Sequence, residues 1–86
     1  IKVDKIILYG SYSTGMATKE SDIDVIVISD DFNNKNYWQC IDILVNAIYK
    51  VKAPIEAVPM TPNEWINKNS LLAQYATEGD VIYARA

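Results

Sequence analysis

The hydrophobic and polar positions of this chain divide it into short apolar runs separated by polar turns. The run at residues 5–9 predicts a buried strand, and the Gly- and Ser-rich stretch 10–15 predicts the turn that leaves it. A second strand is expected to begin at Asp22-Ile23-Asp24 and to continue through the apolar run 25–28. Because side chains alternate along a strand, we expect Asp22 and Asp24 to share one face, about 7 Å apart.

Residues 29–36 are polar and rich in turn formers, which predicts a loop. From Tyr37 to about Val51 the apolar residues recur at helical spacing, which predicts a helix. We expect its apolar stripe to pack against the sheet, and this stripe comprises Trp38, Ile41, Leu44, Val45 and Ile48. A second interpretation is a partner-binding face, because Tyr37, Trp38 and Tyr49 crowd the same helix. Cys40 lies in this apolar stretch and is expected in the core.

The last third of the chain predicts one strand, two short helices and a final strand. Residues 53–60 are bracketed by prolines, which is typical of a strand at a sheet edge. Thr61-Pro62-Asn63-Glu64 is a helix start, so Glu64 is interpreted as a capping residue. Ser70 is expected to cap a second helix that Gly79 stops, and residues 81–84 form the last strand. The predicted fold class is therefore α/β, with a small mixed sheet of about four strands packed with helices.

The carboxylates at the start of the second strand are the candidate chemistry of the chain. Asp22 and Asp24 have the spacing to chelate a hard cation, and Mg²⁺ is bound by one or two carboxylates plus water and phosphates. Other motifs are excluded because the residues that they require are absent at the required positions. A P-loop needs Gly-Lys-Ser/Thr after its spacer, whereas Gly15 is followed here by Met16. An EF-hand loop needs ligands where this chain has an apolar run. A solvated residue at a strand edge would explain Asp22 alone, but Asp24 stands where a strand former is expected.

Composition limits the possible functions further. We expect the 86 residues to make one domain, residues 1–86, with no membrane-spanning run and no signal peptide. The first residue is Ile1 and not Met, which leaves open the loss of an N-terminal piece such as a helix. A single cysteine favours a cytoplasmic location. The absence of histidine excludes Ser-His-Asp catalysis and His-containing zinc sites. The net charge of −3 argues against nucleic acid as a partner.

The stretch LYGSYSTGMATKESDIDVIVIS resembles the signature of the DNA polymerase β-like nucleotidyltransferase superfamily, and residues 6–29 match it without a gap. It is most similar to the small members called minimal nucleotidyltransferases, which commonly begin with a helix. The resemblance implies a polymerase β-like palm fold and a third carboxylate on a later strand, which is Glu56 here. A solvent-facing Glu on an edge strand is the alternative for Glu56.

The resemblance also implies a reaction. ATP would be attacked at its α-phosphorus, with two Mg²⁺ ions held by Asp22, Asp24 and Glu56, and Glu56 would help to deprotonate the acceptor hydroxyl. Gly10 and Ser11 would bind the β- and γ-phosphates at a helix N-terminus. Thr14 stands where relatives often carry Arg, so a cationic phosphate contact is missing from the pattern.

Members of this family are commonly antitoxins that add AMP to a tyrosine of an all-helical HEPN toxin. The resemblance therefore implies an ATP-dependent adenylyltransferase with a HEPN-type partner protein. Two alternatives stay open: a weakly catalytic module that neutralises its partner by occlusion, and a nucleotidyltransferase that modifies an antibiotic-type small molecule. A homo-oligomer also stays open.

Overall fold

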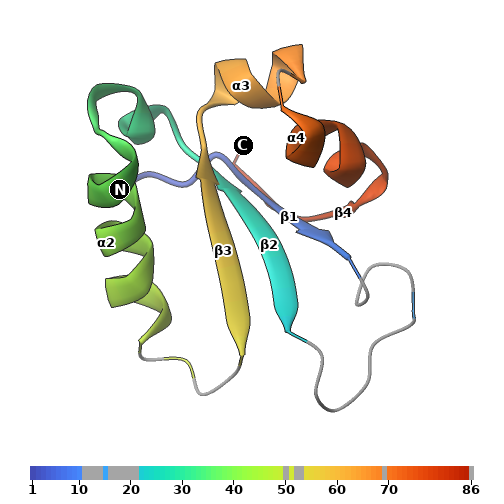
Figure 1. The fold of residues 1–86 in the computed structure, drawn as a ribbon, viewed down its shortest axis with the longest axis horizontal. Coiled ribbons are helices and arrows are strands. Elements are labelled where there is room, and N and C mark those ends of the chain that lie inside the picture. The colour runs from blue at the N-terminus through green and yellow to red at the C-terminus, as the bar shows by residue number, and fades with distance from the viewer. Residues whose placement is uncertain (11–14, 16–21, 50, 52–53, 69, 86) are drawn as a thin grey trace.

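Four strands form one mixed sheet in the centre of the molecule (Figure 1). The structure is a computed structural model that describes residues 1–10, 15, 22–49, 51, 54–68 and 70–85. Its elements are β1 (Lys5–Tyr9), β2 (Ile23–Ile28), the 3₁₀-helix η1 (Asp30–Asn34), α2 (Tyr37–Ile48), β3 (Ile55–Met60), α3 (Pro62–Asn67), α4 (Leu71–Tyr75), the 3₁₀-helix η2 (Ala76–Glu78) and β4 (Asp80–Ala84).

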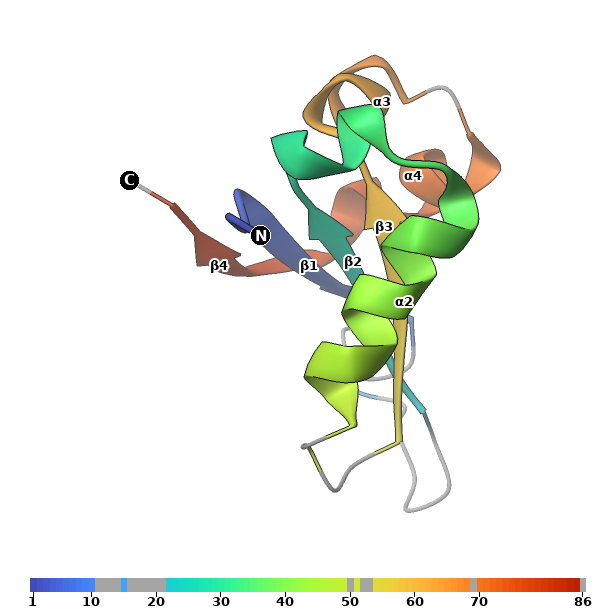
Figure 2. The ribbon, with the colours of Figure 1, turned by 90° about the vertical axis from the view of Figure 1, so that its left-hand side faces the viewer.

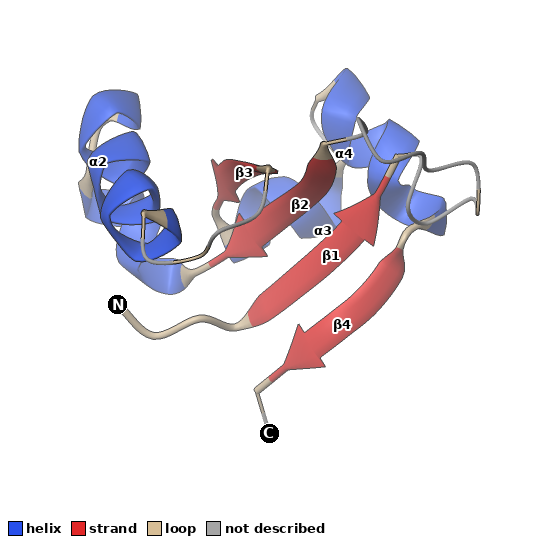
Figure 3. Ribbon diagram, turned by 90° about the horizontal axis from the view of Figure 1, so that it is seen from below, coloured by secondary structure: helices blue, strands red, loops and turns tan. Residues whose placement is uncertain are grey.

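The strand order is β3-β2-β1-β4, which can be followed in Figure 3. Strand β1 pairs antiparallel with both β2 and β4, whereas β2 and β3 are parallel. The predicted α/β class and the mixed sheet of about four strands are confirmed. Strand β3 lies at an edge, as its prolines predicted, because a residue without an N–H cannot complete a ladder on both sides.

Both faces of the sheet are covered by helices, and β2 contributes to both cores. Val25 and Val27 pack with Cys40 and Leu44 of α2, on one face. On the opposite face, Ile26 and Ile28 form a second apolar cluster with residues of α3, α4 and η2. The continuous apolar run of β2 therefore reflects burial on both sides of one central strand.

Helix α2, which lies along one side of the sheet in Figure 2, is shorter than expected and buries only part of the predicted stripe. It ends at Ile48, and Cys40 and Leu44 are its buried residues. Trp38 is 73% exposed and Val45 is 55% exposed, so their predicted place in the core is wrong. Each residue turns a helix by about 100°, so Val45 points well away from Leu44 beside it. No described helix combines the length and the apolar character needed to cross a membrane.

The predicted loop at residues 29–36 contains the 3₁₀-helix η1, which is a correction. Ser29 caps η1 by accepting a hydrogen bond from the Asp31 N–H, and Phe32 is buried in the cluster beneath α2. Burial of this one aromatic side chain fixes a segment whose other residues are polar. A prediction based on polar turn formers does not take account of a single buried aromatic residue such as Phe32.

The predicted N-terminal caps of the two helices in the last third of the chain are confirmed. Thr61 and Glu64 form a capping box at α3, and the Ser70 side chain accepts a hydrogen bond from the Ala73 N–H at α4. Gly79 follows η2 with an extended backbone, not a left-handed one. A Cβ at Gly79 would lie 2.5 Å from the Leu8 carbonyl oxygen, so glycine is needed there for close approach to β1.

Candidate active site

Strand β2 carries the two aspartates of the motif at its beginning. Asp22 is exposed and immediately precedes the strand, and Asp24 is its second residue. Ile26 and Ile28 belong to the cluster beneath α3 and α4, so Asp24 faces the same side by alternation. The carboxylate of Asp24 therefore lies on the face of the sheet that α3 and α4 cover.

Glu56 lies directly beside Asp24 on the neighbouring strand. In the parallel pairing of β2 with β3, Asp24 and Glu56 are register partners. Register partners present their side chains on the same face, with Cβ atoms about 5 Å apart. The structure thus brings together two of the three carboxylates that the sequence singled out, from residues 32 positions apart in sequence.

A third residue, Tyr9, extends this row onto β1. Tyr9 is the register partner of Asp24 in the antiparallel pairing of β1 with β2. The row across three strands is therefore Tyr9, Asp24 and Glu56, and we call it the carboxylate row. Sequence reasoning treated Tyr9 only as part of a buried strand. Its position two residues after the buried Ile7, and so on the same face, was the signal available.

Gly10 follows the row on β1 and is shaped to accommodate Asp24. Its φ of +74° lies in the left-handed region that glycine adopts readily. A Cβ at Gly10 would lie 2.5 Å from the Asp24 Oδ2 atom. Glycine therefore lets the backbone at the end of β1 approach a carboxylate, which no other residue would allow.

The like charges of the site raise the pKa of Glu56. The charge of Asp22 is the largest cause, followed by a hydrogen bond with the Asp24 side chain and the charge of Asp24. The pKa of Tyr9 is also raised, first by burial and then by the charges of Asp24 and Glu56. Asp22 thus acts on the row electrostatically although it precedes the strand. A cation at this place would relieve the repulsion that raises these pKa values.

The donor set of the row fits Mg²⁺. Carboxylate oxygens are the ligands that this ion prefers, and it needs only one or two from the protein when phosphates and water complete its shell. Within the described ranges, no group of three or more acidic or cysteine side chains converges so that it could hold one ion. Asp24 and Glu56, as register partners, would offer two such ligands, and the remaining positions around the ion would be left for substrate oxygens.

An aromatic residue from α4 stands over this end of the sheet. The ring of Tyr75 meets the ring of Tyr9 edge-on, with centroids 6.1 Å apart and planes at 85°. Sequence reasoning missed Tyr75, because periodicity cannot be assigned within a five-residue helix.

Part of the predicted phosphate-binding turn lies outside the described residues. Ser11 and Thr14 fall in this segment, and so does the helical turn expected after Gly10. Gly15 is described, with a φ of +76° and open space at the position that a Cβ would take. Its predicted place at the end of a turn agrees with this left-handed backbone.

Residues 1–78 match the family model described as a nucleotidyltransferase domain. Two proteins of Methanocaldococcus jannaschii, both named as candidate protein adenylyltransferases, are related in sequence. One is 35% identical over 86 residues, covering 95% of this chain and 80% of the relative. The other is 30% identical over 84 residues, covering 95% of this chain and 77% of the relative.

Two solved structures share the fold. A candidate nucleotidyltransferase from Sulfolobus solfataricus matches with a TM-score of 0.72 at 12% identity, over 96% of this chain and 65% of that one. A chain from a structure described as a toxin-antitoxin with AMP-PNP matches with a TM-score of 0.61 at 26% identity, over 99% of this chain and 64% of that one. The chain thus spans slightly less than two thirds of these solved chains. With a family model that covers most of its length, the chain belongs to the nucleotidyltransferase domain family.

Proposed function

We propose that this chain transfers AMP from ATP to a hydroxyl group, in a reaction that depends on Mg²⁺, and that the acceptor is a tyrosine of a helical, HEPN-type partner protein. The observation that carries the proposal is the carboxylate row. Asp24 and Glu56 are register partners, and the glycine beside them allows close backbone approach. Such a row is suited to a substrate that brings both phosphate and cation to the site.

The comparisons support the transfer of AMP and the involvement of a second protein, but they do not extend to the acceptor residue. The two archaeal relatives are named as candidate protein adenylyltransferases, which favours AMP and a protein acceptor. The toxin-antitoxin neighbour was solved with an ATP analogue, which favours ATP and a partner protein. The tyrosine and the HEPN class of partner rest on the resemblance of residues 6–29 to minimal nucleotidyltransferases.

The proposed reaction forms one bond and breaks one. The acceptor oxygen bonds to the α-phosphorus of ATP, and the bond from that phosphorus to the bridging oxygen breaks, so that pyrophosphate leaves. Glu56 is on the edge strand β3, where an outside hydroxyl has access, and it would receive the acceptor proton before passing it to water. Gly10 and Ser11 would bind the β- and γ-phosphates.

Asp22, Asp24 and Glu56 would hold the Mg²⁺ ions, which when bound stabilise the charge on the attacking and leaving oxygens. Without a counter-cation, Asp22 and Asp24 would repel the triphosphate. ATP binding should therefore require the metal.

Calorimetry tests this requirement with ATP and Mg²⁺, and again with EDTA in place of the metal. We expect binding with Mg²⁺ and none with EDTA. Asp24→Asn should weaken the Mg²⁺-dependent binding, whereas Asp42→Asn, on the opposite face of the sheet, should not. Equal binding with and without the metal would contradict the metal site.

Co-expression with the protein encoded by the neighbouring reading frame tests the acceptor, with intact mass measurement as the readout. We expect the partner to gain the mass of one or more adenylyl groups with the wild-type chain and none with Asp22→Ala. Peptide mapping should place the group on a tyrosine. If Asp22→Ala still neutralised an unmodified partner, occlusion would replace transfer as the function. If a purified small molecule were modified without any partner, the protein acceptor would be wrong.

A further inference from the structure

Tyr75 combines an exposed ring with a fixed backbone. Its side chain is 64% exposed, although it belongs to a helix that packs on the sheet. Ala73 and Ala76, on either side of it in sequence, are both 0% exposed and lie in the core cluster of this face. The backbone at Tyr75 is therefore held in place by its neighbours, while the ring itself contributes little burial.

The ring stands at the end of the carboxylate row. Its edge-on contact is with Tyr9, the register partner of Asp24. Tyr9 is followed directly by Gly10, the first residue of the candidate phosphate-binding turn. Tyr75 thus overlies β1, whereas Glu56 lies on β3 at the free edge of the sheet.

We propose that Tyr75 positions the nucleotide by stacking its exposed ring on the nucleobase of the bound triphosphate. This inference rests on the proposed function, which puts the phosphates near Gly10 and the α-phosphorus near Asp24. A nucleotide held in this way occupies the β1 half of the face, and the acceptor enters from the β3 edge. Of the other large exposed aromatic side chains in the described residues, Tyr37, Trp38 and Tyr49 are on or next to α2, across the sheet from Asp24. Tyr83 is on β4 as the register partner of Ile6, whose side chain packs in the cluster on the α2 side of the sheet.

An aromatic ring beside a phosphate site can stabilise a bound nucleotide by stacking on its base. Base stacking on an aromatic side chain contributes about 1–3 kcal/mol per base and tolerates any base, because every base has a π-face. A T-shaped contact joins the edge of one ring to one face of the other, so Tyr9 covers at most one face of the Tyr75 ring and leaves the other available. Tyr75 would therefore raise affinity for nucleosides in general and add nothing for phosphate alone.

The test compares two ligands that differ in the nucleoside. Binding of α,β-methylene-ATP, in which transfer is blocked, and of inorganic triphosphate is measured by calorimetry with Mg²⁺. The variants are Tyr75→Ala, Tyr75→Phe and Tyr75→Leu, and Tyr49→Ala is the control for loss of an exposed tyrosine on the other side of the sheet. We expect Tyr75→Ala to weaken the nucleotide about tenfold and to leave triphosphate binding unchanged.

Tyr75→Phe should stay within about twofold of the wild type, because the ring face is kept. Tyr75→Leu keeps apolar bulk without a π-face, so it should resemble Tyr75→Ala and provides a variant that preserves packing. Unchanged nucleotide binding in both would overturn the inference. An equal loss for both ligands would overturn it too, and assign Tyr75 a packing role. If the wild type bound neither ligand, the proposed function itself would be wrong. This result differs from unchanged nucleotide binding and from an equal loss of both ligands, which would overturn only the role of Tyr75.

Discussion

At the scale of single residues, the candidate site depends on one missing side chain. Gly10 directly follows β1 and Asp24 lies on the neighbouring strand β2, and the place where a Cβ would stand at Gly10 is already taken by the Asp24 carboxylate. The glycine therefore serves two purposes, a left-handed turn and space for a candidate ligand. These purposes can be separated, because Gly15 shares the left-handed backbone but has open space around it.

We predict that Gly10→Ala abolishes Mg²⁺-dependent ATP binding and lowers the free energy of unfolding by more than Gly15→Ala does. A left-handed backbone costs an alanine about 1–2 kcal/mol at either position. Only at Gly10 must the carboxylate of Asp24 also move. Urea denaturation and calorimetry of both variants provide the measurement. Equal effects of the two substitutions would show that the contact with Asp24 is unimportant.

The raised pKa of Glu56 predicts how the stability of the metal-free protein changes with pH. The folded chain binds this proton more readily than the unfolded chain, so the contribution of Glu56 to the free energy of unfolding rises as the pH falls through the raised pKa. The charge of Asp22 is the largest single cause, so Asp22→Asn should weaken this dependence. Urea midpoints in EDTA, from about pH 7 to about pH 4, measure it. Asp42→Asn is the control, and an identical dependence in Asp22→Asn and wild type would contradict the prediction.

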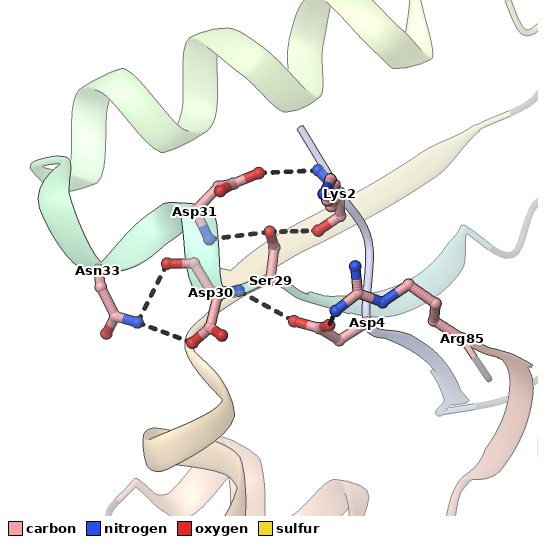
Figure 4. Close-up of polar contacts among 7 residues, drawn as sticks. All are labelled: Lys2, Asp4, Ser29, Asp30, Asp31, Asn33 and Arg85. Atoms are coloured by element: carbon pink, nitrogen blue, oxygen red, sulfur yellow. Dashed lines mark hydrogen bonds and ion pairs between the residues drawn. The ribbon is translucent and has the colours of Figure 1, made fainter.

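At the scale of elements, a polar cluster joins the N-terminal segment to η1 and to the end of β4 (Figure 4). The Ser29 hydroxyl donates to the Lys2 carbonyl at 2.6 Å and accepts from the Asp31 N–H at 3.1 Å. The Asp31 carboxylate accepts from the Lys2 N–H at 2.8 Å, which is the main reason why its pKa is lowered. Asp4 accepts from the Asp30 N–H and pairs with Arg85 at 2.8 Å. Ser29 is the fully buried member, so the cluster depends on it.

We predict that Ser29→Ala lowers the free energy of unfolding by about 1–3 kcal/mol, because the part-buried Lys2 carbonyl and Asp31 N–H lose the fully buried hydroxyl that is their partner. Asn33→Ala serves as the matched control in the same cluster. Its side chain donates to Asp30 in an exposed position, so its loss should cost about 0.5 kcal/mol or less. Urea denaturation measures both. A Ser29→Ala variant as stable as the control would contradict the role of this hydroxyl.

The sequence was most informative where one residue has one strong local reason for its position. Asp24 in an apolar run, the prolines around β3 and the Thr61–Glu64 capping box each determine a structure by themselves. Predictions failed where tertiary packing decides. Which of Leu44 and Val45 faces the sheet depends on the rotation of α2, and both are apolar. Tyr9 and Tyr75 likewise reach the candidate site only through strand register and helix packing.

At the scale of the whole molecule, the two apolar clusters share one sheet. Successive residues of the central strand β2 belong to alternate clusters, so separation of either helical layer would expose one face of the strand on which the other layer also packs. Each layer also carries one tryptophan. Trp38 lies on α2, and Trp65 lies on α3. The Lys68 ammonium nitrogen lies over the Trp65 ring, 3.1 Å from the ring centroid.

We predict a single cooperative unfolding transition that both tryptophans report at the same urea concentration. Trp38→Phe and Trp65→Phe each leave one fluorescent reporter, on opposite sides of the sheet. Two-state unfolding requires that each reporter agree with far-UV circular dichroism measured on the same variant. A gap between fluorescence and dichroism midpoints in either variant would show that one helical layer melts separately.

The pairing of β1 with β4 has a consequence for how the chain is made. Strand β1 leaves the ribosome well before its second partner, residues 80–84. Until synthesis reaches them, Lys5–Leu8 present an unpaired apolar edge of the kind that recruits strands from other chains. The candidate site is exposed to the same delay, since Tyr9, Asp24, Glu56 and Tyr75 are spread over most of the sequence. A nascent chain would therefore gain its activity and lose its tendency to aggregate at nearly the same moment.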